Sequence, residues 1–304
     1  GNYVDTIDSD KALTTKVVRL SAPTIVIEDN IASWEPNEFV DENRFGYKVI
    51  IYKGGVSVYD NVINQNEINF DFDNMNEDTY SIEVQALAGD NTQYLPSEVS
   101  VIDNITKFKA PVVDDVLTNS KVTWTYDLTE SEILSLVGYE IKVRNENGDE
   151  WFETISNINT KEYEMSDGYD AGKYFISVRL LGDGQTNIRS LFSNEIEVYK
   201  LESPVINICR ANGNVSTSSY MMTWDNVTGA TSYIVVLNNN QVIETNDNYI
   251  IIDDMVALED GLNSVRLKVN GDNVYYLNSK LGDASSFVLI DSNEADLRIE
   301  SGLV

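Results

Sequence analysis

Apolar and polar residues alternate along short stretches of this chain, which is the pattern of a β-strand with one buried and one solvated face. In the stretch GYEIKV, the residues Tyr139, Ile141 and Val143 share one face, and the charged residues between them take the other. The stretch YSIEVQAL, which begins at Tyr80, alternates in the same way. The pattern therefore predicts strands that pack one face against a facing sheet.

These stretches recur as three similar series with a period of roughly 90 residues. Each series opens with a proline, reaches a lone tryptophan and continues into a strand led by tyrosine. The prolines are Pro23, Pro111 and Pro204, the tryptophans Trp34, Trp124 and Trp224, and the tyrosines Tyr47, Tyr139 and Tyr233. Because the tryptophan keeps its register in every copy, we expect it to lie in the core.

Glycine and asparagine follow each tyrosine-led strand and predict a hairpin turn, because such turns need positive φ. The turns are Gly54-Gly55, Asn147-Gly148 and Asn238–Asn240. A second turn follows the next strand of each copy, at Gly89-Asp90, Gly182–Gly184 and Asn270–Asp272. Short strands separated by regular turns are typical of a β-sandwich.

Helical patterns are scarce. In the segment Leu128–Val137, Thr129 and Glu132 have the spacing of a capping box, which predicts a short helical turn in a loop. Asp253–Gly261 is a second candidate.

We predict an all-β chain of three tandem sandwich domains in an extended arrangement. The domains are residues 20–107, 108–200 and 201–290, preceded by a flexible lead, 1–19, and followed by an acidic tail, 291–304. The linkers between the copies are very short, at 103–109 and 199–203, and short linkers predict restricted bending.

Composition excludes several classes of function. The 304 residues include no histidine and one cysteine, so a His-based catalytic triad, a Cys/His pair and a zinc site built from these residues are excluded. Lys and Arg number 21 and Asp and Glu 50, which gives a net charge of −29. This charge argues against binding to nucleic acid or to an anionic membrane surface. No apolar stretch approaches the length of a membrane-spanning helix.

The repeated landmarks resemble fibronectin type III domains in the divergent form of bacterial secreted and surface proteins. The third copy carries the resemblance furthest, in the segment WDNVTGATSYIVVL that begins at Trp224. Tyr80 and Tyr174 stand where the family places its tyrosine-corner residue, whereas Asn263 stands there in the third copy. The resemblance covers residues 20–290 and implies seven-stranded sandwiches. An immunoglobulin-like sandwich of different topology stays open, because these landmarks do not fix the strand order.

The densest acidic cluster holds Asp71, Asp73, Glu77 and Asp78. Calcium prefers several oxygen ligands from one loop, so a Ca²⁺ site here is one hypothesis. The cluster does not match an EF-hand, because its sixth position is Asn76 rather than glycine. A solvated strand face is the alternative, and no other cofactor is implied.

Trp151 breaks the threefold pattern of tryptophans. It follows the Asn147-Gly148 turn, so either Trp151 or Phe152 should face outward. An exposed aromatic side chain can stack on a sugar ring or dock a partner. The alternative is packing against a neighbouring domain or loop, since lone surface hydrophobes are common. Tyr275 and Tyr276 are similar candidates in the third copy.

The resemblance implies a non-catalytic spacer or adhesion module of a bacterial cell-surface or secreted protein. We expect a monomeric chain outside the cell, with a protein or glycan partner at the cell surface. One version of this expectation adds a lipid anchor on a segment outside this chain. The first alternative is a carbohydrate-binding accessory protein of a polysaccharide-degrading system. The second is a glycoside hydrolase with two carboxylates about 5–10 Å apart.

Overall fold

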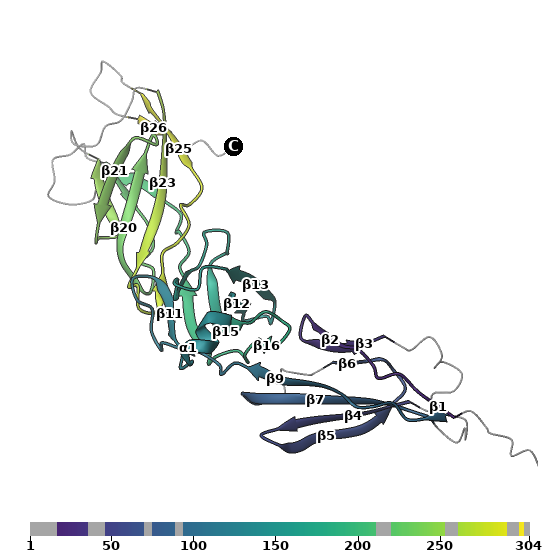
Figure 1. The fold of residues 1–304 in the computed structure, drawn as a ribbon. Coiled ribbons are helices and arrows are strands. Elements are labelled where there is room, and N and C mark those ends of the chain that lie inside the picture. The colour runs from purple at the N-terminus through teal and green to yellow at the C-terminus, as the bar shows by residue number, and fades with distance from the viewer. Residues whose placement is uncertain are drawn as a thin grey trace, which may run out of the picture. The chain divides into compact units, whose positions relative to one another are not determined.

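The computed structural model describes residues 17–35, 46–69, 75–88, 94–210, 220–252, 261–290 and 298–300. In these residues the chain is all-β apart from one short helix (Figure 1), as the alternation predicts. No helix in them has the length and hydropathy to cross a lipid bilayer.

The chain divides into two compact units. Unit 1 holds residues 1–110, 127–138 and 180–191, and unit 2 holds residues 111–126, 139–179 and 192–304. The second predicted repeat therefore contributes segments to both units. The domain boundaries after residues 107 and 200 stay a prediction.

The first repeat forms two sheets in unit 1, with the orders β2-β3-β6 and β16-β9-β7-β4-β5. The strands are β2 (Ile25–Glu28), β3 (Ile31–Trp34), β4 (Gly46–Lys53), β5 (Val56–Ile63), β6 (Glu67–Asn69), β7 (Asp78–Leu87) and β9 (Ser100–Lys107), and β16 (Asn187–Ile188) joins from the second repeat. A separate pair joins β1 (Val18–Arg19) to β8 (Tyr94–Leu95).

The second repeat forms sheets with the orders β10-β11-β14 and β13-β12-β15-β17-β24. Its elements are β10 (Val112–Val113), β11 (Lys121–Thr125), α1 (Glu130–Ser135), β12 (Gly138–Asn145), β13 (Glu150–Ile155), β14 (Glu162–Glu164), β15 (Gly172–Leu181) and β17 (Ile196–Lys200), and β24 (Tyr276–Leu277) joins from the third repeat.

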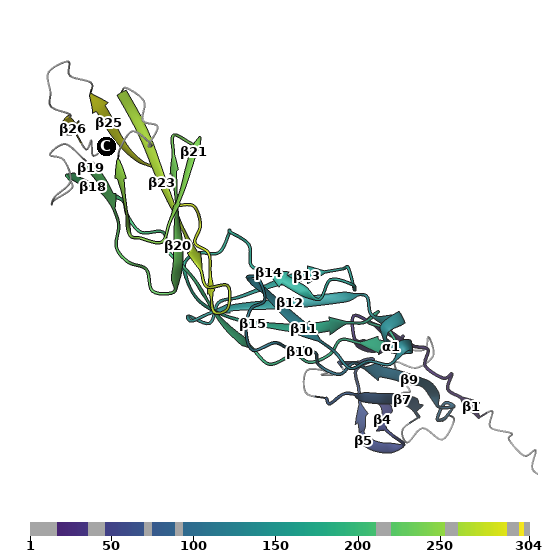
Figure 2. The same ribbon diagram turned by 90° about the vertical axis from the view of Figure 1, so that its left-hand side faces the viewer.

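The third repeat forms sheets with the orders β18-β19-β22 and β21-β20-β23-β25-β26 in unit 2 (Figure 2). Its strands are β18 (Asn207–Arg210), β19 (Tyr220–Thr223), β20 (Ala230–Leu237), β21 (Gln241–Thr245), β22 (Tyr249–Ile252), β23 (Gly261–Gly271), β25 (Ser285–Ile290) and β26 (Arg298–Glu300).

The strand order of the sandwich is the same in all three repeats. The first, second and fifth strands form the smaller sheet, and the third, fourth, sixth and seventh lie in the larger one. In the constant-type immunoglobulin arrangement the fourth strand instead joins the first, second and fifth. The observed order therefore favours the fibronectin type III-like sandwich, which the sequence landmarks left undecided.

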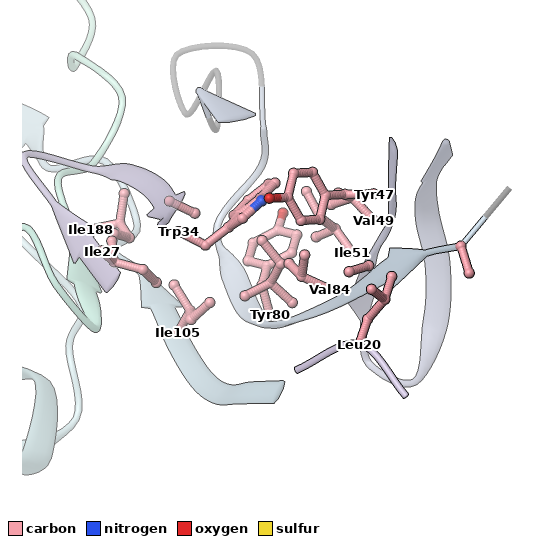
Figure 3. Close-up of a cluster of buried hydrophobic side chains, with 14 residues drawn as sticks. Leu20, Ile27, Trp34, Tyr47, Val49, Ile51, Tyr80, Val84, Ile105 and Ile188 are labelled. Atoms are coloured by element: carbon pink, nitrogen blue, oxygen red, sulfur yellow. The ribbon is translucent and has the colours of Figure 1, made fainter. Parts of the chain in front are cut away.

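The predicted core tryptophans are buried in every repeat, each with 2% of its surface exposed. Each packs against the tyrosine that leads the next strand, with ring centroids 5.3 Å apart for Trp34–Tyr47, 5.0 Å for Trp124–Tyr139 and 5.4 Å for Trp224–Tyr233. Figure 3 shows the first of these pairs in the core of the first repeat. Such pairs stabilise by about 0.5–1.5 kcal/mol beyond the burial of their area.

Two tyrosine corners form as the resemblance implies. The hydroxyl of Tyr80 donates to the carbonyl of Asn76 at 2.6 Å, and that of Tyr174 donates to the carbonyl of Asp170 at 3.0 Å. In the third repeat the side chain of Asn263 instead accepts a hydrogen bond from Asn238 at 2.9 Å.

The hairpin turns lie where glycine and asparagine predict them. Gly54 and Gly55 have φ of 55° and 81°, and Asn238 and Asn239 have φ of 48° and 56°, as mirror-image two-residue turns require. The second repeat differs, because its loop spans residues 146–148 and only Gly148 has positive φ.

The helix α1 confirms the predicted capping box. The backbone N–H of Glu132 donates to the Thr129 side chain, and the Glu132 carboxylate accepts from the Thr129 backbone. The second helical candidate lies outside the described residues, except for Gly261, which begins β23.

The structure differs from the sequence prediction at the chain ends and linkers. The predicted lead contains β1, and the predicted tail contains β26, which pairs with β25. The predicted linkers are partly strand, because β9 runs to Lys107 and β17 runs to Lys200. The rest of the lead before residue 17 lies outside the described residues, as do 291–297 and 301–304.

Candidate binding pocket and repeat junctions

A cavity of about 700 Å³ opens in the second repeat within unit 2. One wall is the end of the β12–β13 hairpin, and the other is the segment from Ser166 to Tyr174 that leads into β15. Trp151 lies in the first wall. Ligand pockets commonly have volumes of roughly 300–1,000 Å³, so this cavity has the size of a binding site.

The register of β13 explains why Trp151 reaches this cavity. Trp151 pairs with Val143, and Phe152 pairs with Lys142. Directly paired residues share a face of the sheet, so Trp151 lies on the side of the buried Val143 and Phe152 on the outer side. Trp151 is nevertheless 40% exposed, and Phe152 is 53% exposed. Both aromatic side chains thus reach solvent, because β13 is the edge strand of its sheet.

Three aromatic rings pack together in the cavity wall. Trp151 meets Tyr169 edge to face with centroids 5.6 Å apart and lies 6.4 Å from the ring of Tyr174. Tyr169 and Tyr174 are 5.7 Å apart. The corner hydrogen bond holds Tyr174, so this aromatic group is fixed to the β15 end of the loop.

Glu153 is fixed by two tyrosine hydroxyls. Tyr163 and Tyr169 donate to the same oxygen, Oε1, at 2.7 and 2.8 Å. Burial, and then the bond to Glu153, raise the pKa of Tyr163, and the same causes raise the pKa of Tyr169 to about 12. Both hydroxyls therefore stay protonated donors at neutral pH, and Oε2 of Glu153 is left to face other groups.

The cavity lining is negatively charged. Its carboxylates are Glu146, Asp149, Glu153 and Asp170, and its one ammonium group is Lys173. Lys173 lies 2.7 Å from Glu197 outside the lining, which raises the pKa of the lysine.

The indole has no counterpart in the other repeats. Trp151 pairs with the third inward-facing residue of β12. The third inward-facing residue of β4 in the first repeat pairs with Tyr59, and that of β20 in the third repeat pairs with Gln241. Tyr59 packs against the core of its repeat. An aromatic side chain exposed into a cavity at this position is thus a feature of the second repeat.

The other predicted aromatic candidates lie elsewhere. Tyr275 is 48% exposed and does not line the cavity. Tyr276 stacks on Tyr199 with centroids 5.2 Å apart, and its ring covers Gly229. Tyr276 therefore has a packing role between the second and third repeats.

The predicted calcium ligands are only partly described. Asp71 and Asp73 lie outside the described residues. Glu77 is exposed, and Asp78 lies 3.4 Å from the ammonium group of Lys53. The described part of the chain contains no group of three or more acidic or cysteine side chains placed to hold a metal ion.

A second repeated feature joins each repeat to the chain that enters it. The loop between the sixth and seventh strands holds a short strand, which is β8, β16 or β24. That strand pairs in parallel with the entering chain, β1 with β8, β9 with β16 and β17 with β24. We call each of these a junction pair. Since β9 and β17 are also the last strands of the preceding repeats, each serves two repeats.

A further backbone hydrogen bond extends every junction pair. The bonds run from Leu20 to Leu95 at 3.0 Å, from Phe108 to Ile188 at 3.1 Å and from Leu201 to Leu277 at 3.2 Å. Ile188 also packs into the core of the first repeat near Ile27 and Ile105 (Figure 3). The junction pair therefore carries apolar packing as well as backbone bonds.

A buried serine fastens each of these loops to the sixth strand. Ser97, Ser190 and Ser279 are fully buried, and each hydroxyl accepts the N–H of a strand residue at 2.8–2.9 Å and donates to the next carbonyl. The strand residues are Ala86, Leu180 and Val269.

Aspartate shapes the same loop. Oδ1 of Asp272 accepts the backbone N–H groups of Val274, Tyr275 and Tyr276, each at 2.8 Å. Asp183 accepts those of Gln185 and Asn187. Although burial opposes the shift, these hydrogen bonds hold the pKa of both carboxyl groups below the usual value.

The loop also contacts the first turn of the preceding repeat. The N–H of Asn30 donates to the carbonyl of Gly184, and the N–H of Leu117 donates to that of Val274, both at 3.0 Å. One backbone hydrogen bond of this kind thus forms at each of the two junctions between consecutive repeats.

A recurring sequence pattern marks this loop, and the preference of glycine and aspartate for turns does not by itself explain it. A Gly-Asp pair is followed in each copy by a serine at one fixed spacing, in Gly89-Asp90 with Ser97, Gly182-Asp183 with Ser190 and Gly271-Asp272 with Ser279. The residues that complete the cavity, Glu153 and Tyr169, have no such recurrence in the sequence.

No protein-family model matches the sequence, and no curated protein matches it. Among solved structures, the chain is similar to the FN1–FN3 domains of chicken CNTN1, with 12% identity, a TM-score of 0.27 and coverage of 91% of this chain and 100% of that one. It is also similar to the chicken interferon gamma receptor alpha chain, with 13% identity, a TM-score of 0.25 and coverage of 59% and 96%. The fold assignment rests on the strand order described above.

Proposed function

We propose that this chain is a non-catalytic spacer or adhesion module of a bacterial cell-surface or secreted protein. The observation that carries the proposal is the junction pair, in which one strand serves two consecutive repeats. Backbone bonds and a buried serine resist bending at such a connection more than a flexible linker does. A module that holds a binding partner at a set distance needs that property.

Spin labels test the spacer role. In a Cys209→Ser background, Thr154→Cys and Val242→Cys place labels on exposed positions of the second and third repeats in unit 2. We expect a narrow distance distribution between the labels. The same pair with Leu277→Gly should broaden it, because Leu277 is buried in the junction pair. An equally broad distribution in both proteins would contradict the spacer role.

The absence of catalysis is part of the proposal. A carboxyl group that acts as general acid needs a raised pKa. In the described part of the chain, hydrogen bonds and ion pairs hold the pKa of Asp170, Asp183, Glu197 and Asp272 below the usual value, so these four carboxyl groups are unsuited to that role. Hydrolysis of a polysaccharide by the purified chain, lost in a carboxylate variant, would overturn it.

A location outside the cell and a monomeric state belong to the same proposal. Mutual repulsion from a net charge of −29 favours separate chains. Sedimentation equilibrium should give the monomer mass, and a protease added to intact cells should cleave the protein. A dimer mass, or full protection in intact cells but not in lysed ones, would count against these two points.

The cavity at Trp151 favours carbohydrate binding as a second candidate function. An exposed indole over a polar cavity is suited to stack on a sugar ring and to hydrogen-bond its hydroxyls. On a glycan array we expect hits that Trp151→Ala removes. Phe152→Ala is the matched control, because Phe152 is exposed on the outer face of the same strand.

A further inference from the structure

The cavity beside Trp151 has a charge that restricts what it can bind. We infer that its ligand is a sugar carrying a primary ammonium group, such as a glucosamine unit of a deacetylated glycan. This inference rests on the second candidate function and adds the charge of the ligand to it.

The cavity carries negative charge that its own hydrogen bonds leave partly unsatisfied. In Glu153, both tyrosine hydroxyls bind Oε1, so Oε2 has capacity for a ligand. In Asp149, Oδ2 accepts from Asn145 at 2.9 Å, and Oδ1 has the same capacity. A neutral sugar would compensate neither charge, whereas an ammonium group donates three hydrogen bonds to carboxylates.

The nearby lysines pair with other carboxylates. Lys173 pairs with Glu197 at 2.7 Å, and Lys280 pairs with Asp170 at 2.8 Å. Neither ammonium group therefore neutralises Glu146, Asp149 or Glu153. The cavity keeps a negative potential toward solvent and attracts a cation.

The aromatic wall of the cavity also favours a cation. Trp151 is 40% exposed and lines the cavity beside these carboxylates. An indole face attracts a cation through its quadrupole and also packs against the C–H face of a sugar. The described carboxylates do not gather as a metal site, so an organic cation that also uses the indole is the better match.

The pocket needs little rearrangement to bind. Trp151 is packed against Tyr169, whose hydroxyl holds Glu153 at 2.8 Å. These contacts therefore hold the indole and the carboxylate in place before a ligand binds, which lowers the entropy cost of ordering these side chains on binding.

Titration calorimetry of the full chain with three tetramers tests the inference. The ligands are tetramers of glucosamine, N-acetylglucosamine and glucose, at about 0.15 M salt, where exposed charges are screened beyond about 8 Å. We expect one site for the glucosamine tetramer, with affinity about tenfold or more above that of the acetylated tetramer. Glu153→Gln and Trp151→Ala should each weaken it about tenfold or more.

Matched controls separate the cavity from the general charge of the chain. Glu162→Gln removes a carboxylate outside the cavity, and Phe152→Ala removes an exposed ring on the outer face. Both variants should bind the glucosamine tetramer with the affinity of the parent chain. Circular dichroism establishes that each variant is folded, and Glu153→Gln keeps the shape of the side chain if Trp151→Ala does not fold.

The outcomes distinguish the two proposals. Equal binding of the glucosamine and acetylated tetramers overturns the charge inference and leaves carbohydrate binding in place. No binding of any tetramer overturns both. If Glu153→Gln binds the glucosamine tetramer as tightly as the parent chain, binding comes from the overall negative charge, and the inference is overturned. Tighter binding of a lysine tetrapeptide than of the glucosamine tetramer overturns it as well.

Discussion

At the scale of single residues, close approach explains one glycine of the third repeat. Gly229 has φ of 85°, and a Cβ there would lie 2.4 Å from the ring of Tyr276. Gly55 has nearly the same φ, 81°, with open space around it. The two positions share the backbone requirement for glycine and differ in the neighbouring ring.

Replacing each glycine by alanine separates these two costs. Gly55→Ala should lower the free energy of unfolding by about 1–2 kcal/mol, the cost of a left-handed conformation. Gly229→Ala should lower it by a further amount of roughly 1–3 kcal/mol, because the ring must move. Urea denaturation measures both, and equal losses would show that the Tyr276 ring yields freely.

The loop aspartates predict how stability depends on pH. The pKa of Asp272 is lower in the folded chain than the unfolded value of about 3.9. Its contribution is therefore complete above that unfolded value and is lost as the pH falls through the folded pKa. Unfolding followed from about pH 6 to pH 2 should show this loss, and Asp272→Asn should reduce the slope over the acidic part of this range. An unchanged slope would assign the acid sensitivity to other carboxyl groups.

At the scale of elements, the alternation predicts the long strands well and the short ones poorly. Strand β12 and the capped helix α1 follow from local pattern and capping chemistry. The two-residue strands β8, β16 and β24 do not, because they exist only through pairing with a strand distant in sequence. For the same reason, residues expected as linker continue β9 and β17.

The buried serines should contribute more to the free energy of unfolding than surface serines do. Ser190→Ala or Ser279→Ala leaves the N–H of Leu180 or Val269 without its hydroxyl acceptor in a buried place, which costs about 1–3 kcal/mol. Ser57→Ala, at an exposed strand position, should change stability by less than about 0.5 kcal/mol. Thermal denaturation compares the three, and equal effects would show that the loop does not depend on the hydroxyl.

The candidate site was only half predictable at this scale. Trp151 is identifiable because it departs from the repeat. Glu153 follows from the alternation, because it lies two residues along the same strand and on the same face. Tyr169 comes from the loop before β15, and only the fold brings it to them. For Tyr276 the sequence predicts an exposed ligand-binding ring, whereas in the structure the ring stacks on Tyr199.

At the scale of the whole molecule, charge opposes folding. The chain has 50 acidic against 21 basic residues, so most carboxylates have no cation to pair with. Many of the pairs among the described residues are partly exposed to solvent, such as Arg144 with Glu195 at 2.7 Å, whereas Arg179 and Lys200 are buried in theirs. Exposed pairs of this kind contribute about 0–1 kcal/mol each, which does not offset general repulsion.

Salt should therefore stabilise the protein. Raising NaCl from about 10 to 150 mM shortens the screening length from about 30 to 8 Å and weakens repulsion between distant carboxylates. We expect Tm to rise over this range, with sucrose of equal osmolality as the uncharged control. A fall in Tm would mean that the ion pairs outweigh the repulsion.

The junction pair has a mechanical consequence. If tension separates the third repeat from the second along β17, the parallel strand β24 must slide lengthwise past it. The hydrogen bonds of the pair and the one from Leu201 are then loaded in shear, all at once, rather than opened one after another. Such a connection yields at a higher force than a peeled hairpin, so the joints of this chain are suited to carry load.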